Sequence, residues 1–416
     1  MGALVALGAL SCAQQGPATR PAPIVERPRS VPSSAAEAAR TPGVPQPIPP
    51  GGVRPPPVAP PEPAVVTAPL AERPDAVPSE PVAVPSVTES RATRPPPAST
   101  DLVALIVPLD VPAYARAADA VRAGFLAAAE AAGAKDKCVV IGHKEDGVLG
   151  AFDEAGRRGV RVVVGPLLRD DLKTLAIADA VIPWTVALNR LDDGTPLPPA
   201  VYSFPLAVES DARVIARRAQ MDGVRAIDVI ASDPPLMKRM AGAFTSEWIA
   251  GGGAAPGALR FDPSPDALTL MRRNLTRAIP DAVVLAVDGN DAALAKSFIG
   301  TLPAYASGLL FERPDLAVVR DLNDVRIVEV PWLVTPDAPE IANFQRRDLG
   351  SAALDRLYAL GIDAFRVSQA FGDDPPERFE LEGATGRITL VDGHQFAREG
   401  RFGVYRDGRL LPLDTH

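Results

Sequence analysis

The chain has 416 residues, 46 of them proline, and a formal net charge of −8 at pH 7. Its first hundred residues hold 24 of the prolines and no Lys, Phe, Tyr or Trp, and their 8 Arg against 7 Asp and Glu leave about −9 on the remaining chain. An acidic chain without a basic run argues against nucleic-acid binding and against electrostatic docking on anionic lipid. No later segment approaches the roughly 18 consecutive apolar residues that span a bilayer.

The beginning of the chain resembles a lipoprotein signal. Residues 1–10 (MGALVALGAL) form an uninterrupted apolar run that leads into Ser11-Cys12-Ala13. This pattern is typical of a secretory signal followed by a lipobox, in which Cys12 becomes the lipidated first residue of the mature protein. The run lacks a positively charged start and has Ala9 where a lipobox usually has Leu. A start codon assigned too far downstream would explain the missing charge; the alternative is that Cys12 is incidental.

Residues 13–100 are expected to form a disordered, Pro-rich linker, because they lack the large side chains that offset the entropy of folding. Their composition favours polyproline II, which extends about 3.1 Å per residue, so the segment could reach roughly 250 Å. A recognition tract for a proline-binding partner is the alternative. The prolines are scattered without a sustained motif, which favours the spacer.

Regular structure begins at Asp101, and the pattern predicts alternating strands and helices. The predicted strands are 102–107, 138–141, 160–164 and 181–189, and the predicted helices are 111–132, 149–157 and 170–179. Such alternation indicates a doubly wound parallel sheet. After the strand 160–164, Gly165 permits a sharp turn and Pro166 suits a first helical position, with acidic residues in the first turn.

The segment 202–206 is predicted to cross into a second α/β lobe, since the alternation restarts after it. There the predicted helices are 209–221, 235–250, 266–278 and 291–300, and the predicted strands are 226–231, 258–261, 282–287 and 324–330. A helix at 353–371 returns to the first lobe, and short hairpin strands follow with Asp-Gly turns at 392–393 and 407–408. We expect a first lobe of about 101–205 plus 335–375 and a second of about 206–334 plus 376–412.

Ligands of open α/β sheets bind beyond the carboxyl ends of the strands. The candidate cleft residues at such positions are Tyr114, Gly165, Pro166, Leu168 and Asn189. The alternative interpretations are that Tyr114 is an ordinary surface residue and Asn189 an ordinary turn residue. Gly165-Pro166 would then only connect a strand to a helix.

Catalytic and metal-binding patterns are missing from the sequence. The three histidines, His143, His394 and His416, have no Cys, His or carboxylate at ligand spacing, so neither a metal nor a cofactor is expected. Cys138 lies in an apolar strand pattern and is expected to be a buried small hydrophobe. The adjacent acidic pairs, at 145–146, 192–193 and 373–374, are interpreted as solvated turns. Nothing in the sequence indicates an enzyme.

Several segments of residues 101–412 resemble the type I periplasmic-binding-protein fold and, within it, the LppC/LpoA family of outer-membrane lipoproteins. They are LVALIVPL at 102–109, VRAGFLAA at 121–128, VVGPL at 163–167, ALN at 187–189, YALGIDAFR at 358–366 and LEGATG at 381–386. Enteric members have a helical-repeat domain before this one, where this chain has the Pro-rich segment. The resemblance implies two Rossmann-like lobes. Resemblance to Gram-negative lipoproteins with Ala13 after the cysteine implies sorting to the outer membrane, on its periplasmic face.

The family resemblance implies a non-enzymatic regulator that is held to the membrane only by its lipid and stimulates a class A penicillin-binding protein, a peptidoglycan synthase. The alternative is a periplasmic protein that binds an amino acid or similar small molecule in the cleft between the lobes. Such proteins hold the ligand carboxylate with backbone N–H groups and a hydroxyl at a helix start. Here the corresponding turn offers Pro166, which has no N–H, and no Ser or Thr. A purely structural tether between wall and membrane is a third interpretation.

Overall fold

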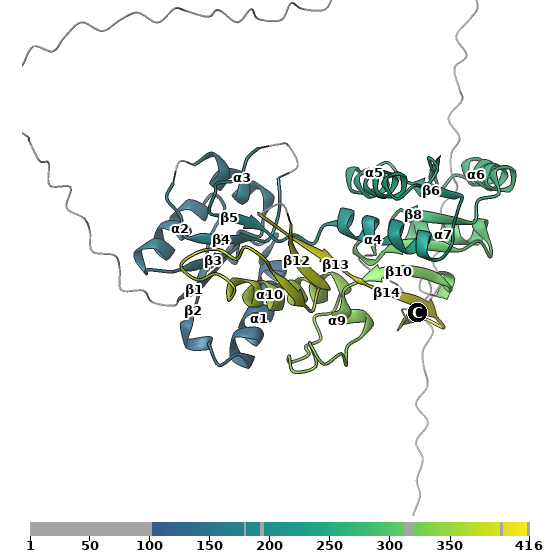
Figure 1. Cartoon of the computed structure of the whole chain (residues 1–416). Coiled ribbons are helices and arrows are strands. Elements are labelled where there is room, and N and C mark those ends of the chain that lie inside the picture. The colour runs from purple at the N-terminus through teal and green to yellow at the C-terminus, as the bar shows by residue number, and fades with distance from the viewer. Residues whose placement is uncertain (1–101, 179, 192–194, 312–319, 392–393, 414–416) are drawn as a thin grey trace, which may run out of the picture. The chain divides into compact units, whose positions relative to one another are not determined.

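The computed structural model describes residues 102–413 apart from 179, 192–194, 312–319 and 392–393, and these described residues form two α/β lobes (Figure 1). The first lobe is built on a sheet of strand order β11-β12-β13-β5-β4-β3-β1-β2. Its strands are β1 (Val103–Val107), β2 (Cys138–Gly142), β3 (Val162–Val164), β4 (Trp184–Ala187), β5 (Val201–Ser203), β11 (Glu380–Glu382), β12 (Arg387–Val391) and β13 (Gln395–Glu399). Its helices are α1 (Ala115–Ala131), α2 (Val148–Arg157), α3 (Arg169–Ile177) and α10 (Ala352–Ser368), with a 3₁₀ turn at Lys135–Lys137.

The second lobe is built on a sheet of strand order β15-β14-β10-β9-β8-β6-β7. Its strands are β6 (Ile227–Ala231), β7 (Gly257–Arg260), β8 (Ala282–Ala286), β9 (Ala304–Ser307), β10 (Val325–Glu329), β14 (Arg401–Arg406) and β15 (Arg409–Pro412). Its helices are α4 (Val208–Met221), α5 (Pro235–Ala250), α6 (Pro265–Ala278) and α7 (Gly289–Ile299), with a 3₁₀ turn at Gly308–Leu310. A short helix, α9 (Pro331–Val334), follows β10. The predicted doubly wound alternation of strands and helices is confirmed in both lobes.

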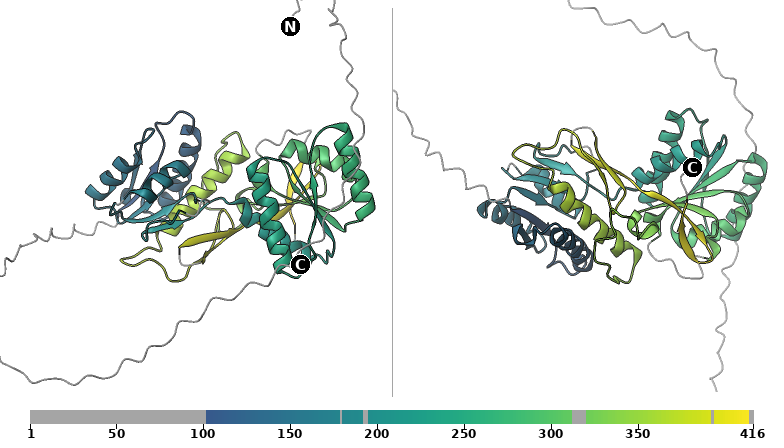
Figure 2. Two further views of the ribbon diagram at one scale, coloured as in Figure 1. Left: turned by 90° about the horizontal axis from the view of Figure 1, so that it is seen from above. Right: turned by 60° about the horizontal axis from the view of Figure 1, so that its bottom comes forward.

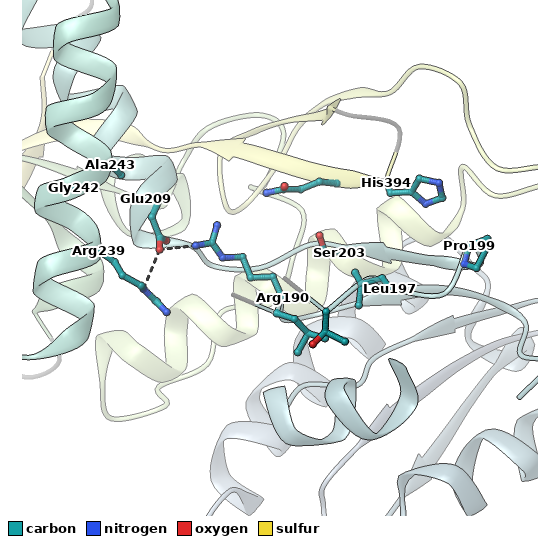
Figure 3. A pocket seen from close by; sticks show the side chains of 12 residues that line it. Arg190, Leu197, Pro199, Ser203, Glu209, Arg239, Gly242, Ala243 and His394 are labelled. Atoms are coloured by element: carbon teal, nitrogen blue, oxygen red, sulfur yellow. Dashed lines mark hydrogen bonds and ion pairs between the residues drawn. The ribbon is translucent and has the colours of Figure 1, made fainter. Parts of the chain in front are cut away.

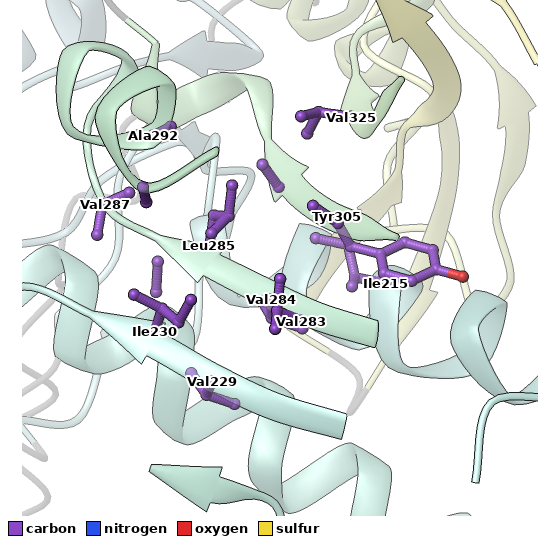
Figure 4. Close-up of a cluster of buried hydrophobic side chains, with 14 of the residues drawn as sticks. Ile215, Val229, Ile230, Val283, Val284, Leu285, Val287, Ala292, Tyr305 and Val325 are labelled. Atoms are coloured by element: carbon purple, nitrogen blue, oxygen red, sulfur yellow. The ribbon is translucent and has the colours of Figure 1, made fainter. Parts of the chain in front are cut away.

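The centre of each sheet is a parallel strand with helices over both faces, which explains the continuous apolar runs in the sequence. Every residue of β8 is buried, and this strand pairs in parallel with β6 on one side and β9 on the other. Figure 4 shows its side chains, among them Val283, Val284 and Leu285, packed with Ile230 and Ile215 from neighbouring elements. Burial of such side chains contributes about 1.5–3 kcal/mol each relative to exposure.

Helices α1 and α10 pack against each other (Figure 1), and two glycines set their distance. A Cβ on Gly124 would lie 1.9 Å from the carbonyl oxygen of Tyr358, and one on Gly361 would lie 2.1 Å from that of Val121. Each glycine therefore admits the backbone of the opposite helix. The two family-like segments at 121–128 and 358–366 are thus the two sides of one helix contact.

The C-terminal strands divide between the two sheets, and one expected lobe boundary was wrong. Strands β11, β12 and β13 join the first sheet, where Gln395 pairs in parallel with Ser203 of β5. Only β14 and β15 extend the second sheet. The switch falls at Gly400 between β13 and β14, and Figure 2 shows these yellow strands running from one sheet to the other. Residues 380–399 thus belong to the first lobe, not the second, because β13 pairs with β5.

Three local features also differ from expectation. The crossover predicted at 202–206 begins with a strand, β5, which pairs in parallel with β4 in the first sheet. Strand β9 was not predicted, because its Ala-Tyr-Ala-Ser sequence lacks β-branched residues. Pro166 follows a cis peptide bond and precedes α3, whose N-cap is Leu168, so Pro166 is not the first helical residue.

The C-terminal hairpin forms as its turn residues predict. Arg406 pairs with Arg409, which leaves Asp407 and Gly408 as a two-residue loop. Both have positive φ, 50° and 78°, as a type I′ turn requires. The other predicted Asp-Gly turn, at 392–393, lies outside the described residues.

Among the described residues, no helix combines the length and the apolar character needed to cross a bilayer. The expected signal segment 1–12 with its lipidated Cys12 and the expected linker 13–100 lie outside the described residues.

Candidate functional site

A cavity of about 950 Å³ lies where the carboxyl end of β4 faces helices α4 and α5 of the second lobe (Figure 3). The first lobe contributes the segment that begins at Arg190, with Ser203, His394 and Gln395. The second lobe contributes residues of α4 and α5. The full lining comprises Arg190, Leu191, Thr195, Leu197, Pro199, Ser203, Glu209, Arg239, Gly242, Ala243, His394 and Gln395.

Two arginines from different lobes meet one carboxylate at the wall of this cavity. The guanidinium of Arg190 lies 2.6 Å from Oε1 of Glu209, and Nε of Arg239 lies 3.0 Å from the same oxygen (Figure 3). Glu209 is 6% exposed and stands in the first turn of α4, where the helix dipole favours negative charge. Two guanidinium groups against one carboxylate leave this wall with one excess positive charge.

The opposite part of the cavity is apolar or neutral. His394 is exposed and lies with its ring over Tyr202, at 4.6 Å between ring centroids and 30° between planes. Ser203 is buried and its backbone N–H donates to the carbonyl of His394. Among the described residues, no hydrogen bond joins the Ser203 hydroxyl to a histidine ring.

Close to the cavity, a buried ion pair joins the lobes. Arg398 on β13 lies 2.8 Å from Oδ1 of Asp211 on α4, and both side chains are 1% exposed. The hydroxyl of Ser307 on β9 donates to the other carboxylate oxygen at 2.5 Å. Burial raises the pKa of Asp211, whereas Arg398 and the Ser307 hydroxyl oppose the rise.

A second buried ion pair joins the lobes where β10 leads toward α10. Nε and Nη2 of Arg356 lie 2.9 and 2.6 Å from the two oxygens of Glu329, which is a bidentate contact. These side chains are 5% and 4% exposed. Glu329 also accepts the backbone N–H of Val330 at 2.8 Å. Removing one partner of such a pair leaves an uncompensated buried charge, so each pair requires both of its members.

Residues 97–408 match the model of a family described as "LppC putative lipoprotein". The chain belongs to this family. The curated "Penicillin-binding protein activator LpoA" of Haemophilus influenzae is 23% identical over 270 residues, which cover 62% of this chain and 46% of that protein. The LppC chain thus spans about half the length of the curated relatives it matches.

Two solved structures support the predicted type I periplasmic-binding-protein fold. One is titled "LpoA (YraM) C-domain from Haemophilus influenzae, a regulator of PBP1A", at 22% identity and a TM-score of 0.64, covering 75% of this chain and all of that one. The other is described as a "putative branched-chain amino acid ABC transporter" from Chromobacterium violaceum, at 30% identity and a TM-score of 0.64, covering 73% of this chain and 99% of that one.

The residues predicted to line a cleft do not line the cavity of the LppC domain. Tyr114 is 46% exposed and begins α1. Gly165 and Pro166 are buried, and a Cβ on Gly165 would lie 2.1 Å from the carbonyl oxygen of Ile106, so this turn is filled by backbone. Leu168 is half-buried at the start of α3 and provides no capping hydrogen bond.

Asn189 uses both ends of its amide within the protein. Its Nδ2 donates to the carbonyl of Leu167 at 3.0 Å, and its Oδ1 accepts the N–H of Arg190 at 2.9 Å. It links the segments that follow β3 and β4. The side chain that lines the cavity is that of the next residue, Arg190. The sequence signal for it was a cation shortly after the end of a strand.

His143 has a carboxylate neighbour that sequence spacing did not reveal. Its Nε2 lies 3.5 Å from Oδ2 of Asp171, in the first turn of α3, and both residues are buried. Burial raises the pKa of Asp171 and the imidazole opposes the rise. The described residues contain no group of three or more potential metal ligands. Cys138 is half-buried, and its Sγ donates to the carbonyl of Ala134 at 3.4 Å.

Proposed function

We propose that this chain is a non-enzymatic lipoprotein that binds and stimulates a class A penicillin-binding protein and so regulates peptidoglycan synthesis. The observation that carries the proposal is membership of the LppC family over residues 97–408, together with curated relatives named penicillin-binding protein activators. The described residues form two lobes, and we assign the stimulating contact to this two-lobe domain.

The connections between the lobes support a regulator with a fixed surface. The Arg398–Asp211 and Arg356–Glu329 pairs are almost fully excluded from water and lie beside the chain crossings. Substituting one partner of either pair costs about 3–5 kcal/mol, because the other charge stays buried without a counterion. An activator that presents one surface to a protein partner gains from such a connection, because less ordering is required on binding.

The chemistry of the first lobe weighs against a carrier of small amino acids. The turn between β3 and α3 provides neither a hydroxyl nor an N–H at Pro166, and the amide of Asn189 is already paired. In the cavity, the carboxylate of Glu209 already contacts the guanidinium groups of Arg190 and Arg239, which are the groups that a ligand carboxylate would bind. A ligand carboxylate would have to displace it.

For the rest of the chain, we propose that Cys12 is lipidated, that the anchor lies in the outer membrane, and that 13–100 is a tether through the cell-wall layer. A polyproline-rich segment of this length reaches roughly 250 Å when extended. Deletion of residues 20–95 in cells is expected to abolish stimulation of the synthase while the protein remains anchored. Full stimulation after the deletion would contradict the tether.

The decisive experiment adds the purified chain to the class A penicillin-binding protein of the same organism and follows glycan polymerisation and peptide cross-linking. A saturable increase in either activity is the expected result. No increase together with no complex at micromolar concentrations would overturn the proposal. Thermal stabilisation by free amino acids would then identify a small-molecule binder instead.

A further inference from the structure

A second hollow, of about 680 Å³, lies between the ends of α6 and α7, and we call it the α6–α7 groove. It is lined by Arg272, Leu275, Thr276, Ile279, Pro280, Phe298, Ile299, Gly300, Thr301, Leu302 and Pro303. Pro280 and Pro303 lie just before β8 and β9 begin. The groove is therefore at the amino ends of these strands, whereas the cavity with Arg190 lies at the carboxyl end of β4. The two sites are separate.

The rim of the groove holds an exposed isoleucine in an unfavourable backbone conformation. Ile279 ends α6 with φ 49° and ψ 56°, the left-handed region in which glycine is usual at this position. A β-branched residue there is strained. Its side chain is 77% exposed, and Leu270 on the same helix is 54% exposed. The fold thus holds an apolar side chain in water at the edge of an apolar hollow, although glycine would suit the backbone better.

Three exposed arginines lie on the same helix: Arg272, Arg273 and Arg277. Among the described residues, their guanidinium groups make no hydrogen bond or ion pair, although the chain beyond residue 100 carries about −9. The nearby carboxylate of Asp281 accepts the backbone N–H groups of Arg225 and Ala226 instead. Arg273 and Arg277 stand four residues apart, a like-charge spacing that disfavours a helix. Of the three, Arg272 lines the groove, while Arg273 and Arg277 lie farther round α6, so this helix carries positive charge from the groove onto its outer surface.

We propose that the α6–α7 groove and the adjoining outer surface of α6 form a docking surface for an acidic segment of a partner protein. The segment inserts an apolar side chain beside Ile279 and pairs carboxylates with Arg272 in the groove and with Arg273 and Arg277 on α6. This inference rests on the proposed function, in which the partner is the class A penicillin-binding protein. We infer an acidic partner because its carboxylates would complement the positive charge of the α6 arginines. The chain's own residues 1–100 carry about +1 and no Phe, Tyr or Trp, so they match neither the arginines nor the hollow.

The test measures binding of the complete chain to the class A synthase at low and moderate salt. The charge-reversal variant Arg272→Glu/Arg273→Glu/Arg277→Glu is expected to raise Kd at least tenfold and to flatten its salt dependence. The matched control, Arg116→Glu/Arg157→Glu/Arg378→Glu, reverses three exposed first-lobe arginines, so it changes net charge equally. We expect this control to change Kd less than threefold.

A second variant separates binding from folding. Ile279→Gly removes the exposed side chain and relieves the left-handed strain, so its unfolding midpoint should stay level or rise. We expect Kd for the synthase to rise at least fivefold. Ile177→Gly removes an isoleucine of similar exposure, 73%, at the end of α3, and should leave Kd unchanged.

The outcomes distinguish the two proposals. If the unmodified chain binds and stimulates the synthase but the α6–α7 groove variants do so equally well, the groove assignment is overturned and the proposed function stands. If the unmodified chain forms no complex, both fail. Binding to equimolar phosphatidylglycerol–phosphatidylcholine vesicles that only the charge-reversal variant loses, or a homodimer that only Ile279→Gly abolishes, would also overturn the assignment.

Discussion

The carboxylate of Asp363 in α10 accepts the hydroxyl hydrogen of Thr385 at 2.7 Å and the backbone N–H of the same residue at 2.6 Å. Its other oxygen accepts the N–H of Ala384 at 2.9 Å. Both Asp363 and Thr385 are fully buried. The most family-like segment, at 358–366, and the motif at 381–386 are therefore one structural unit that fastens the turn before β12 to the long helix.

Asp363→Ala is predicted to lower the free energy of unfolding by about 3 kcal/mol, because it leaves buried N–H groups and a hydroxyl without an acceptor. Urea unfolding followed by circular dichroism measures the change. Asp374→Ala, at an exposed position, is the control and should shift the midpoint little. Equal effects from the two substitutions would show that the buried contact contributes nothing.

Gly361→Ala is predicted to destabilise the domain by about 1–3 kcal/mol, because the new Cβ would overlap the backbone of α1. Helix propensity alone predicts the opposite sign, by about 1 kcal/mol. Gly150→Ala on α2 is the matched control, since a Cβ there meets nothing within 4 Å, and it should stabilise. Thermal unfolding of both variants provides the comparison. A stabilised Gly361→Ala protein would contradict the close helix contact.

Sequence patterns predicted most elements because the signals for them are local. The β-branched run at β3 and the helical periodicity of α5 contain the information needed for their own conformation. The sheet membership of β13 could not be read in this way, because it depends on pairing with β5, almost two hundred residues earlier. β9 was not predicted from the sequence, because its two alanines and its serine have little preference for a strand.

The candidate site was predicted less well for the same physical reason. Arg190, Glu209 and Arg239 come from three different segments, and only the crossing of the chain between lobes brings them together. Asn189 was chosen for its place after a strand, and that reasoning applies equally to its neighbour. The sequence suggested a ligand site at the turn of Gly165. In the structure, the backbone of Ile106 lies too close to this position for any side chain, which explains why a glycine is present.

Arg398→Met is predicted to lower the free energy of unfolding by about 3–5 kcal/mol, because Asp211 is then left as a buried carboxylate with only Ser307 as donor. The double variant Arg398→Met/Asp211→Leu should recover most of this loss, since no buried charge remains. A double-mutant cycle in urea gives the coupling energy directly. A loss below about 1 kcal/mol for Arg398→Met would contradict a pair that requires both of its members.

Cys138 is predicted to be unreactive while the protein is folded, because burial raises the pKa of its thiol to about 11. At pH 9 about half of a thiol with a pKa of 9.0 is thiolate, the reactive form, but only about 1% of this one. A full chain with Cys12→Ser has Cys138 as its single thiol. Labelling with a disulfide reagent at pH 9 should be about 50-fold slower in the folded protein than in urea.

The raised pKa of this thiol also sets the sign of a pH effect on stability. The folded state holds the thiol proton more tightly than the unfolded chain, so stability decreases as pH rises from about 9 to 11. Cys138→Ala should remove this part of the decrease. Glu377→Cys in a Cys12→Ser/Cys138→Ala chain places a thiol at an exposed position and controls for reagent access. Its labelling rates in the folded and unfolded states should be similar, whereas equally fast labelling of folded Cys138 would refute the buried thiol.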